Sequence, residues 1–185
     1  MNTETKQPTC ADLVAQSAAN TIETIRLMLD PQTDDVTLGD DGSLDTVLMI
    51  DGEQCERHED ASNYRDDDTG ELDAEEFISD SMDDIVETQR ERFYEYGLSF
   101  DYVEPSNDNP EPYFRYQISW GGPSTEFRFF ANRRGDDYDW ITYKVEYWYL
   151  DWFDGAKTHV SGEVVELLWA QFNDTGSVQH AFDGV

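Results

Sequence analysis

Charge and aromatic residues occupy separate parts of this chain, and that separation constrains its fold more than any other feature. Residues 30–111 hold 28 acidic and four basic residues, which gives them a net charge of −24 out of −30 for all 185 residues. All five tryptophans lie instead in residues 112–185, whose net charge is −5. Because aromatic side chains bury large areas whereas unpaired carboxylates stay in water, the last segment is expected to build the core and the middle segment to display charge.

The N-terminal part of the chain predicts an amphipathic helix over residues 11–29. Its apolar residues recur at helical spacing, and they are Val14, Ala18, Ile22, Ile25 and Leu29. Thr9 is suited to the N-cap position, and Asp30-Pro31 is expected to stop the helix, because the residue before a proline avoids the helical conformation.

The acidic middle segment predicts one strand and one further helix. Residues 46–50 form a continuous apolar run, which is typical of a buried strand, whereas residues 53–68 are polar and are expected to form a loop. Residues 73–96 show helical spacing of apolar residues, and Gly97 is well placed to end this second helix.

The aromatic segment predicts antiparallel strands. Residues 113–120 alternate strictly, and the residues expected on one face are Phe114, Tyr116, Ile118 and Trp120. Gly121-Gly122-Pro123 is a typical turn sequence, so residues 124–131 are expected to return as the next strand. A turn over 132–137 then leads to a long aromatic strand over 138–153.

The chain is expected to end with a turn, a helix and a tail. Asp154-Gly155 predicts the turn, residues 162–172 predict the helix, and residues 173–185 are expected to form a flexible tail. The residues expected to face inward from this last helix are Val164, Leu167, Leu168 and Phe172.

Together these elements predict an α+β fold, with an antiparallel aromatic-rich sheet in the C-terminal half and helices packed on one face. The length fits one domain over residues 1–185. Within it, residues 30–111 are the acidic segment and residues 112–172 are the β-rich core.

The charge excludes several partners and favours one. It repels nucleic acid and anionic membranes, and it accelerates encounter with basic proteins. No apolar run reaches the length of a signal core or a membrane span, so a cytoplasmic protein with free thiols at Cys10 and Cys55 is expected. A halophile's acidic surface is an alternative, but it predicts charge spread evenly along the chain. The sequence does not determine the oligomeric state, and a homodimer is compatible with it.

Catalytic and cofactor motifs are absent from the sequence. The three histidines, His58, His159 and His180, are scattered, and there is no nucleophile elbow or phosphate-binding glycine loop. We therefore expect a protein that is not an enzyme and that holds no cofactor and no metal.

One acidic stretch, Asp66–Phe77, partly matches a calcium-binding EF-hand loop. Gly70 fits the sharp turn, Leu72 the apolar position and Glu76 the closing ligand. Arg65, however, stands at the first ligand position, where a cation opposes Ca²⁺. A degenerate EF-hand-like Ca²⁺-binding module is therefore kept as an alternative function of a different class.

A row of carboxylates on the second predicted helix is the candidate partner-binding site. The spacing of i, i+4, i+7/8, i+11 and i+15 places them on one face, over about 22 Å at 1.5 Å per residue. That length corresponds to about six phosphates of a duplex strand. Since like charges at i, i+4 destabilise a helix, their retention indicates that the negative field is useful. With the acidic loop before the helix, the predicted site consists of Asp66, Asp67, Asp68, Asp73, Glu76, Asp80, Asp83, Asp84, Glu87 and Glu91.

Three stretches carry a resemblance to known proteins: Arg92–Tyr102 (RFYEYGLSFDY), Tyr113–Phe130 (YFRYQISWGGPSTEFRFF) and Val145–Ala156 (VEYWYLDWFDGA). They resemble a group of small uncharacterised acidic proteins of bacterial plasmids and other mobile elements. In charge and size the chain is also similar to the DNA-mimic anti-restriction and anti-CRISPR proteins, with no shared residue motif. This second resemblance implies an inhibitor that occupies the nucleic-acid-binding site of a basic restriction, CRISPR or other DNA-binding host-defence protein. An immunity protein for a basic nuclease toxin is the alternative.

Overall fold

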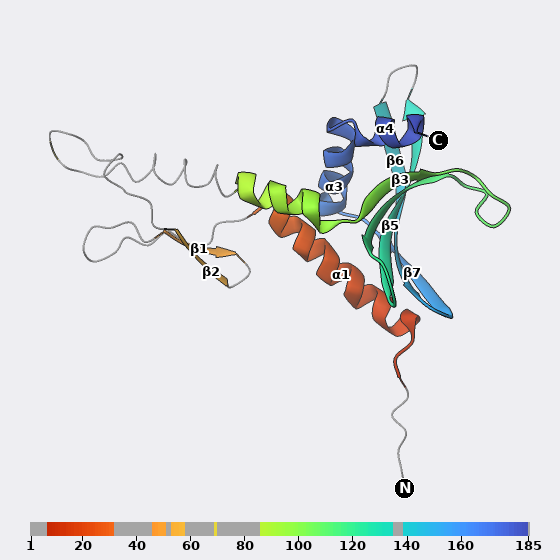
Figure 1. Ribbon diagram of the computed structural model, residues 1–185, viewed down its shortest axis with the longest axis horizontal. Helices are drawn as coiled ribbons and strands as arrows, with labels where there is room; N and C mark the ends of the chain where they lie inside the picture. Colours follow the sequence, from red (N-terminus) through yellow and green to blue (C-terminus); the bar gives the residue numbers. More distant parts are fainter. Residues whose placement is uncertain are drawn as a thin grey trace, which may run out of the picture. The chain divides into compact units, whose positions relative to one another are not determined.

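The computed structural model describes residues 7–31, 46–50, 53–57, 69, 86–134 and 139–184. The chain divides into two compact units, one formed by Met1–Ile25 with Tyr94–Val185 and the other by Arg26–Phe93. Of the described residues, those of the first unit form a five-stranded sheet and three helices, and those of the second include a two-stranded sheet (Figure 1). The predicted α+β class is confirmed.

The sheet of the first unit is an antiparallel meander in the order β3-β4-β5-β6-β7. Its strands are β3 (Ser99–Val103), β4 (Tyr113–Ser119), β5 (Ser124–Arg134), β6 (Asp139–Asp151) and β7 (Asp154–Val160). Tyr116 pairs with Phe127, which in turn pairs with Tyr147, so alternate residues of neighbouring strands form rows across the sheet. The register shifts between Gln117 and Ser119 and again between Phe130 and Ala131.

One face of this sheet carries the aromatic core. Phe114, Phe127, Phe129 and Tyr147 are at most 1% exposed. Helix α3 (Glu163–Asp174) adds Phe172, whose ring centre lies 4.1 Å from that of Phe100. Helix α4 (Ser177–Asp183) adds Phe182, which contacts Tyr102 and Trp140 at 5.1 and 4.9 Å. Stacked and edge-to-face pairs of this kind fix the helices on the sheet.

Helix α1 (Cys10–Leu29) packs on the same face, as Figure 1 shows, and it forms where the sequence predicts a helix. The hydroxyl groups of Ser17 and Thr21 lie 2.8 and 3.0 Å from the buried Tyr147 hydroxyl. At the start of α1 the capping bond runs opposite to the expected one, since the Asp12 carboxylate accepts the Thr9 backbone N–H over 2.9 Å. The Thr9 hydroxyl also donates to this carboxylate, which satisfies a donor just before the first turn.

The loop expected over residues 53–68 begins instead with a strand. Strand β2 (Glu53–Arg57) pairs antiparallel with β1 (Thr46–Ile50), which forms where a strand is predicted. This strand could not be predicted from an apolar pattern, because its sequence is polar and only the backbone pairing with β1 defines it. The Asp51-Gly52 dipeptide between the strands is typical of a hairpin turn and was the available signal.

The predicted turns around β6 are displaced. Asn132 and Arg133 continue β5 and pair with Ile141 and Trp140, whereas a turn was expected there. At the other end Asp151 pairs with Asp154, so the turn consists of Trp152-Phe153, and Asp154-Gly155 begins the unpredicted strand β7. This edge strand carries few apolar side chains, so its sequence has no strong strand pattern.

The C-terminal helices also differ from the prediction. The buried residues of α3 are Val165, Leu168, Trp169 and Phe172, whereas Val164 is half-buried and Leu167 is 37% exposed. The large indole of Trp169 contacts Phe114 and Phe129. Because Trp169 is buried in this way, the buried face of α3 is shifted by about one residue from the predicted face. The expected flexible tail contains α4, which is anchored by the fully buried Val178 and by Phe182.

The second predicted helix is described only in part. Residues 86–96 are helical and end before Gly97 as predicted, while residues 73–85 lie outside the described residues. The Tyr116 ring occupies the space in which a Cβ on Gly97 would stand, so close approach requires the glycine. Among the described helices, none has both the length and the apolar character needed to span a membrane.

Candidate functional site

Two of the ten predicted partner-binding carboxylates, Glu87 and Glu91, lie in the described part of the chain. Both are exposed on the helical residues 86–96, while Gln89 and Phe93 are 6% and 2% exposed. Four residues separate Glu87 from Glu91, so these two carboxylates share one face of the helix. The other eight predicted residues lie outside the described residues, and they are Asp66, Asp67, Asp68, Asp73, Glu76, Asp80, Asp83 and Asp84. The candidate calcium loop also lies outside them, apart from Thr69.

The face of the five-stranded sheet opposite the aromatic core collects basic residues in pairs with carboxylates. We call it the ion-paired face, and it consists of Asp101, Glu111, Arg115, Glu126, Arg128, Lys144, Glu146 and Lys157. The N–O distances are 3.0 Å for Arg115–Asp101, 2.6 Å for Arg128–Glu126, 2.8 Å for Lys144–Glu111 and 3.0 Å for Lys157–Glu146. Four of the chain's twelve basic residues are therefore neutralised by four carboxylates at this face.

The sheet register produces this arrangement. Asp101 lies opposite Arg115, Arg115 opposite Arg128, and Arg128 opposite Glu146. Trp148, on the same face of β6, lies opposite Lys157 of β7. Cross-strand neighbours on one face are close enough for such charges to meet.

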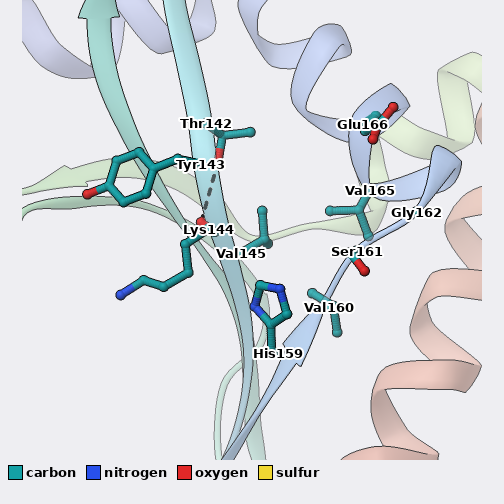
Figure 2. A pocket seen from close by; sticks show the side chains of 10 residues that line it. All are labelled: Thr142, Tyr143, Lys144, Val145, His159, Val160, Ser161, Gly162, Val165 and Glu166. Atoms are coloured by element: carbon teal, nitrogen blue, oxygen red, sulfur yellow. Dashed lines mark hydrogen bonds between the residues drawn. The ribbon is translucent and has the colours of Figure 1, made fainter.

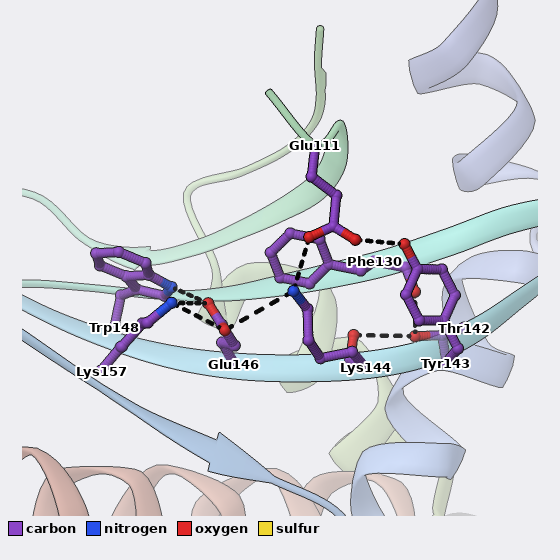
Figure 3. Close-up of polar contacts among 8 residues, drawn as sticks. All are labelled: Glu111, Phe130, Thr142, Tyr143, Lys144, Glu146, Trp148 and Lys157. Atoms are coloured by element: carbon purple, nitrogen blue, oxygen red, sulfur yellow. Dashed lines mark hydrogen bonds and ion pairs between the residues drawn. The ribbon is translucent and has the colours of Figure 1, made fainter. Parts of the chain in front are cut away.

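The centre of the ion-paired face is buried although it is charged. Glu126 and Glu146 are 4% and 9% exposed. Glu146 accepts hydrogen bonds from Lys157 at 3.0 and 3.1 Å and from the Trp148 indole N–H at 3.1 Å, and Figure 3 shows Glu146 between Lys144 and Lys157. These hydrogen bonds replace the water that the Glu146 carboxylate loses on burial.

Glu111, in the segment before β4, ends this network by contacting two residues of β6. Lys144 donates to one of its oxygens at 2.8 Å and Tyr143 donates to the other at 2.7 Å (Figure 3). These hydrogen bonds hold the pKa of the Glu111 carboxyl below its usual range, with Lys144 the larger cause. The same bond to Glu111 raises the pKa of the Tyr143 phenol.

A shallow cavity of about 170 Å³ lies where β6 and β7 meet the start of α3 (Figure 2). Its polar lining includes Thr142, Lys144, His159, Ser161 and Glu166. Ligand pockets commonly enclose about 300–1,000 Å³, and the Lys144 ammonium is already paired with Glu111. In the part of the chain that is described, no group of three or more His, Cys, Asp or Glu side chains could hold a metal ion.

Three large aromatic residues are exposed at one end of the sheet, where the sequence predicted core. We call Trp120, Trp152 and Phe153 the aromatic tip, and they are 79%, 81% and 103% exposed. Trp120 was expected to continue the aromatic face of β4, but the register shift after Gln117 and the end of the strand at Ser119 place it in the turn. No sequence signal distinguishes these aromatic residues from buried ones.

Acidic groups accompany the aromatic tip. Asp151 accepts the Trp152 backbone N–H at 2.8 Å, and Asp154 accepts the Cys10 backbone N–H at 2.8 Å. The bond from Cys10 keeps the pKa of Asp154 below its usual range, and the Thr9 hydroxyl does the same for Asp12. The carboxyl groups of Asp12 and Asp154 are consequently charged at neutral pH.

No protein-family model, no curated protein and no solved structure matches this chain. The resemblance to plasmid-borne acidic proteins and to DNA mimics therefore stays a prediction.

Proposed function

We propose that this protein is a cytoplasmic inhibitor that occupies the nucleic-acid-binding site of a basic protein, such as a restriction, CRISPR or other DNA-binding host-defence protein. It acts by binding, with carboxylates in place of phosphates, and it catalyses no reaction. The observation that carries the proposal is the placement of opposite charges in the structure.

The ion-paired face supports this proposal because it removes cations from the surface that a partner meets. Its four carboxylates and four basic groups sum to zero charge. The net charge of −30 therefore lies outside this face. A concentrated field of one sign steers a partner of the opposite sign and raises its association rate.

The exposed carboxylates of residues 86–96 supply a spacing that suits such a partner. Glu87 and Glu91 lie about 6 Å apart along the helix axis, at 1.5 Å per residue. Two steps along a duplex strand, at about 3.4 Å each, cover a similar distance. Lysine and arginine side chains that contact alternate phosphates can meet these two carboxylates, and the predicted carboxylates before residue 86 would extend the row.

The test uses purified enzymes that bind DNA through basic grooves, namely a restriction endonuclease and a CRISPR effector nuclease. DNA cleavage is measured at rising molar ratios of the protein, and poly-glutamate of equal total charge is the control. We expect inhibition that saturates near equimolar protein, that excess DNA relieves, and that poly-glutamate does not reproduce. Equal inhibition by poly-glutamate would show that charge alone acts, and inhibition confined to a nuclease toxin would instead identify an immunity protein.

A further inference from the structure

The exposure of the aromatic tip is unusual for this chain. Trp140 and Trp169 are 6% and 7% exposed, so the fold buries tryptophan where it builds the core. Trp152 and Phe153 form a two-residue hairpin turn in which smaller polar residues are common. Large exposed aromatic side chains are enriched at the centres of protein interfaces, where tryptophan and tyrosine supply much of the binding energy.

The three residues are brought together by the sheet. Ser124 pairs with Leu150 and Asp151 pairs with Asp154, so the β4–β5 and β6–β7 turns lie at the same end. The Trp152 indole rests against Gly122, where an added Cβ would lie 2.7 Å from the indole nitrogen. The Trp152 side chain thus already contacts the β4–β5 turn before any partner arrives, and a side chain with fewer accessible conformations loses less entropy on binding.

The charges beside the aromatic tip determine which partner fits. Asp12, Asp151 and Asp154 surround the N-terminus of α1 and the β6–β7 turn, and none of them pairs with a lysine or arginine of the described residues. A second copy of this chain would bring the same carboxylates and another charge of −30 to the contact. An anionic membrane would be repelled in the same way. A partner surface with lysine or arginine beside apolar side chains is complementary both to these carboxylates and to the aromatic tip.

We propose that the aromatic tip is the apolar anchor through which the protein holds its basic partner, which rests on the function proposed above. The carboxylates accelerate the encounter with the partner, and their contribution to the affinity falls as the salt concentration rises. The aromatic tip buries apolar surface of the partner next to its cationic groups, so its contribution persists in salt and lengthens the lifetime of the complex.

Two synthetic cationic peptides of equal length and charge serve as probes, one alternating Arg with Leu and the other alternating Arg with Ser. Affinity for the full chain is measured by fluorescence anisotropy from about 50 to about 500 mM NaCl, a range over which surface charges become screened. We expect both peptides to bind at low salt and the Arg/Leu peptide to bind about tenfold more tightly, as for loss of one interface anchor.

Two variants identify the surface responsible. W152S/F153S removes two residues of the aromatic tip, and W120S removes the third independently. L98S/I141S is the matched control, since these residues are 60% and 45% exposed and lie outside the aromatic tip. The aromatic-tip variants are expected to lose the preference for the Arg/Leu peptide and to keep the salt dependence, while the control keeps both. Circular dichroism checks that each variant is folded.

The outcomes separate the two proposals. Equal binding of both peptides to the unaltered chain, or a preference that survives in W152S/F153S, overturns the role of the aromatic tip and leaves the proposed function standing. Failure of both peptides to bind at low salt contradicts the proposed function itself. Sedimentation showing a dimer that W152S/F153S abolishes would assign the aromatic tip to a second copy and overturn the proposal.

Discussion

The guanidinium carbon of Arg128 lies 3.7 Å from the centre of the Trp148 indole, and the Arg128 Nε donates to Glu126 over 2.6 Å. The cation is therefore held by an aromatic face and by a carboxylate that is 4% exposed. The Lys144 ammonium is placed in a similar way, 3.5 Å from the centre of the Phe130 ring and 2.8 Å from Glu111. Basic residues in such settings stabilise the sheet and are not available to oppose the negative surface.

The pair formed by Arg128 and Glu126 gives the first prediction. Arg128→Met leaves the Glu126 carboxylate buried without its cation, and we expect the free energy of unfolding to fall by about 3–5 kcal/mol. The side chains of Arg128 and Glu126 are 12% and 5% exposed, so solvent screens this pair only weakly. Urea denaturation measures the change.

The double variant Arg128→Met/Glu126→Leu is the control for that experiment. It removes both charges, so it should recover most of the stability lost in the single variant. A single variant within about 0.5 kcal/mol of the unaltered chain would show that the pair is unimportant, because that is the range of ordinary surface substitutions.

The contacts of Glu111 predict a dependence on pH. The folded chain holds the pKa of Glu111 below its usual range, so this group stabilises the fold above its unfolded pKa and ceases to do so as pH falls through the folded pKa. Glu111→Gln should therefore be less stable than the unaltered chain at about pH 7, and the difference should shrink below about pH 4, the ordinary range of a glutamate. The effect is small because the side chain is 45% exposed.

Denaturation of both proteins at each pH tests this. Tyr143→Phe is the matched variant, because it removes one donor to Glu111 and leaves Lys144 in place. Tyr143→Phe should therefore lose part of the stability that Glu111→Gln loses at about pH 7, and this smaller loss should also shrink at low pH. A stability difference between the unaltered chain and Glu111→Gln that does not vary with pH would contradict the assignment.

Gly97 and Tyr116 give a prediction about the core. Gly97→Ala places a methyl group in the space of the Tyr116 ring, and we expect a loss of about 1–3 kcal/mol, as for other overpacked sites. Melting temperature reports the loss. Adding Tyr116→Leu should make the alanine tolerable, so the two substitutions should destabilise less together than their separate effects imply. Strict additivity would contradict the close approach.

The sequence predicted the elements whose side chains alternate between core and solvent, and it missed those defined by pairing. Strand β4 was found because Phe114 and Tyr116 alternate with polar residues. Strands β5 and β6 were found because a turn sequence precedes the first and aromatic residues fill the second. Strand β7 was missed because an edge strand needs few apolar residues, and α4 was missed because seven residues give a weak helical pattern.

Of the candidate functional surfaces, only the carboxylate row could be predicted from the sequence. The carboxylate row follows from local helical spacing, and its described members Glu87 and Glu91 are exposed as expected. The ion-paired face could not be found, because it depends on which residues lie opposite one another across strands, such as Arg128 and Glu146. The aromatic tip was hidden for the same reason, since a register shift decides where Trp120 points.

The exposed carboxylates on the helical residues 86–96 predict separate effects on partner binding and on stability. Glu87→Gln with Glu91→Gln removes two like charges at i, i+4, so the helix should be unchanged or more stable by about 0.2–0.5 kcal/mol. Affinity for the inhibited enzyme should fall about tenfold, because charge-assisted contacts are lost. Glu104→Gln with Asp108→Asn is the control, since these exposed carboxylates lie in the segment before β4. Equal losses of affinity in the two double variants would show that the row has no special role.

The central claim, that the acidic surface takes the place of DNA, is tested most directly by the affinity for an inhibited nuclease measured against both salt and DNA. The dissociation constant is determined from about 50 to about 500 mM NaCl, across which screening lengths shorten several-fold, with and without a saturating duplex. We predict that the dissociation constant rises steeply with salt and that the duplex and the protein exclude each other from the nuclease. A complex that is insensitive to salt and that accepts the duplex at the same time would contradict the account.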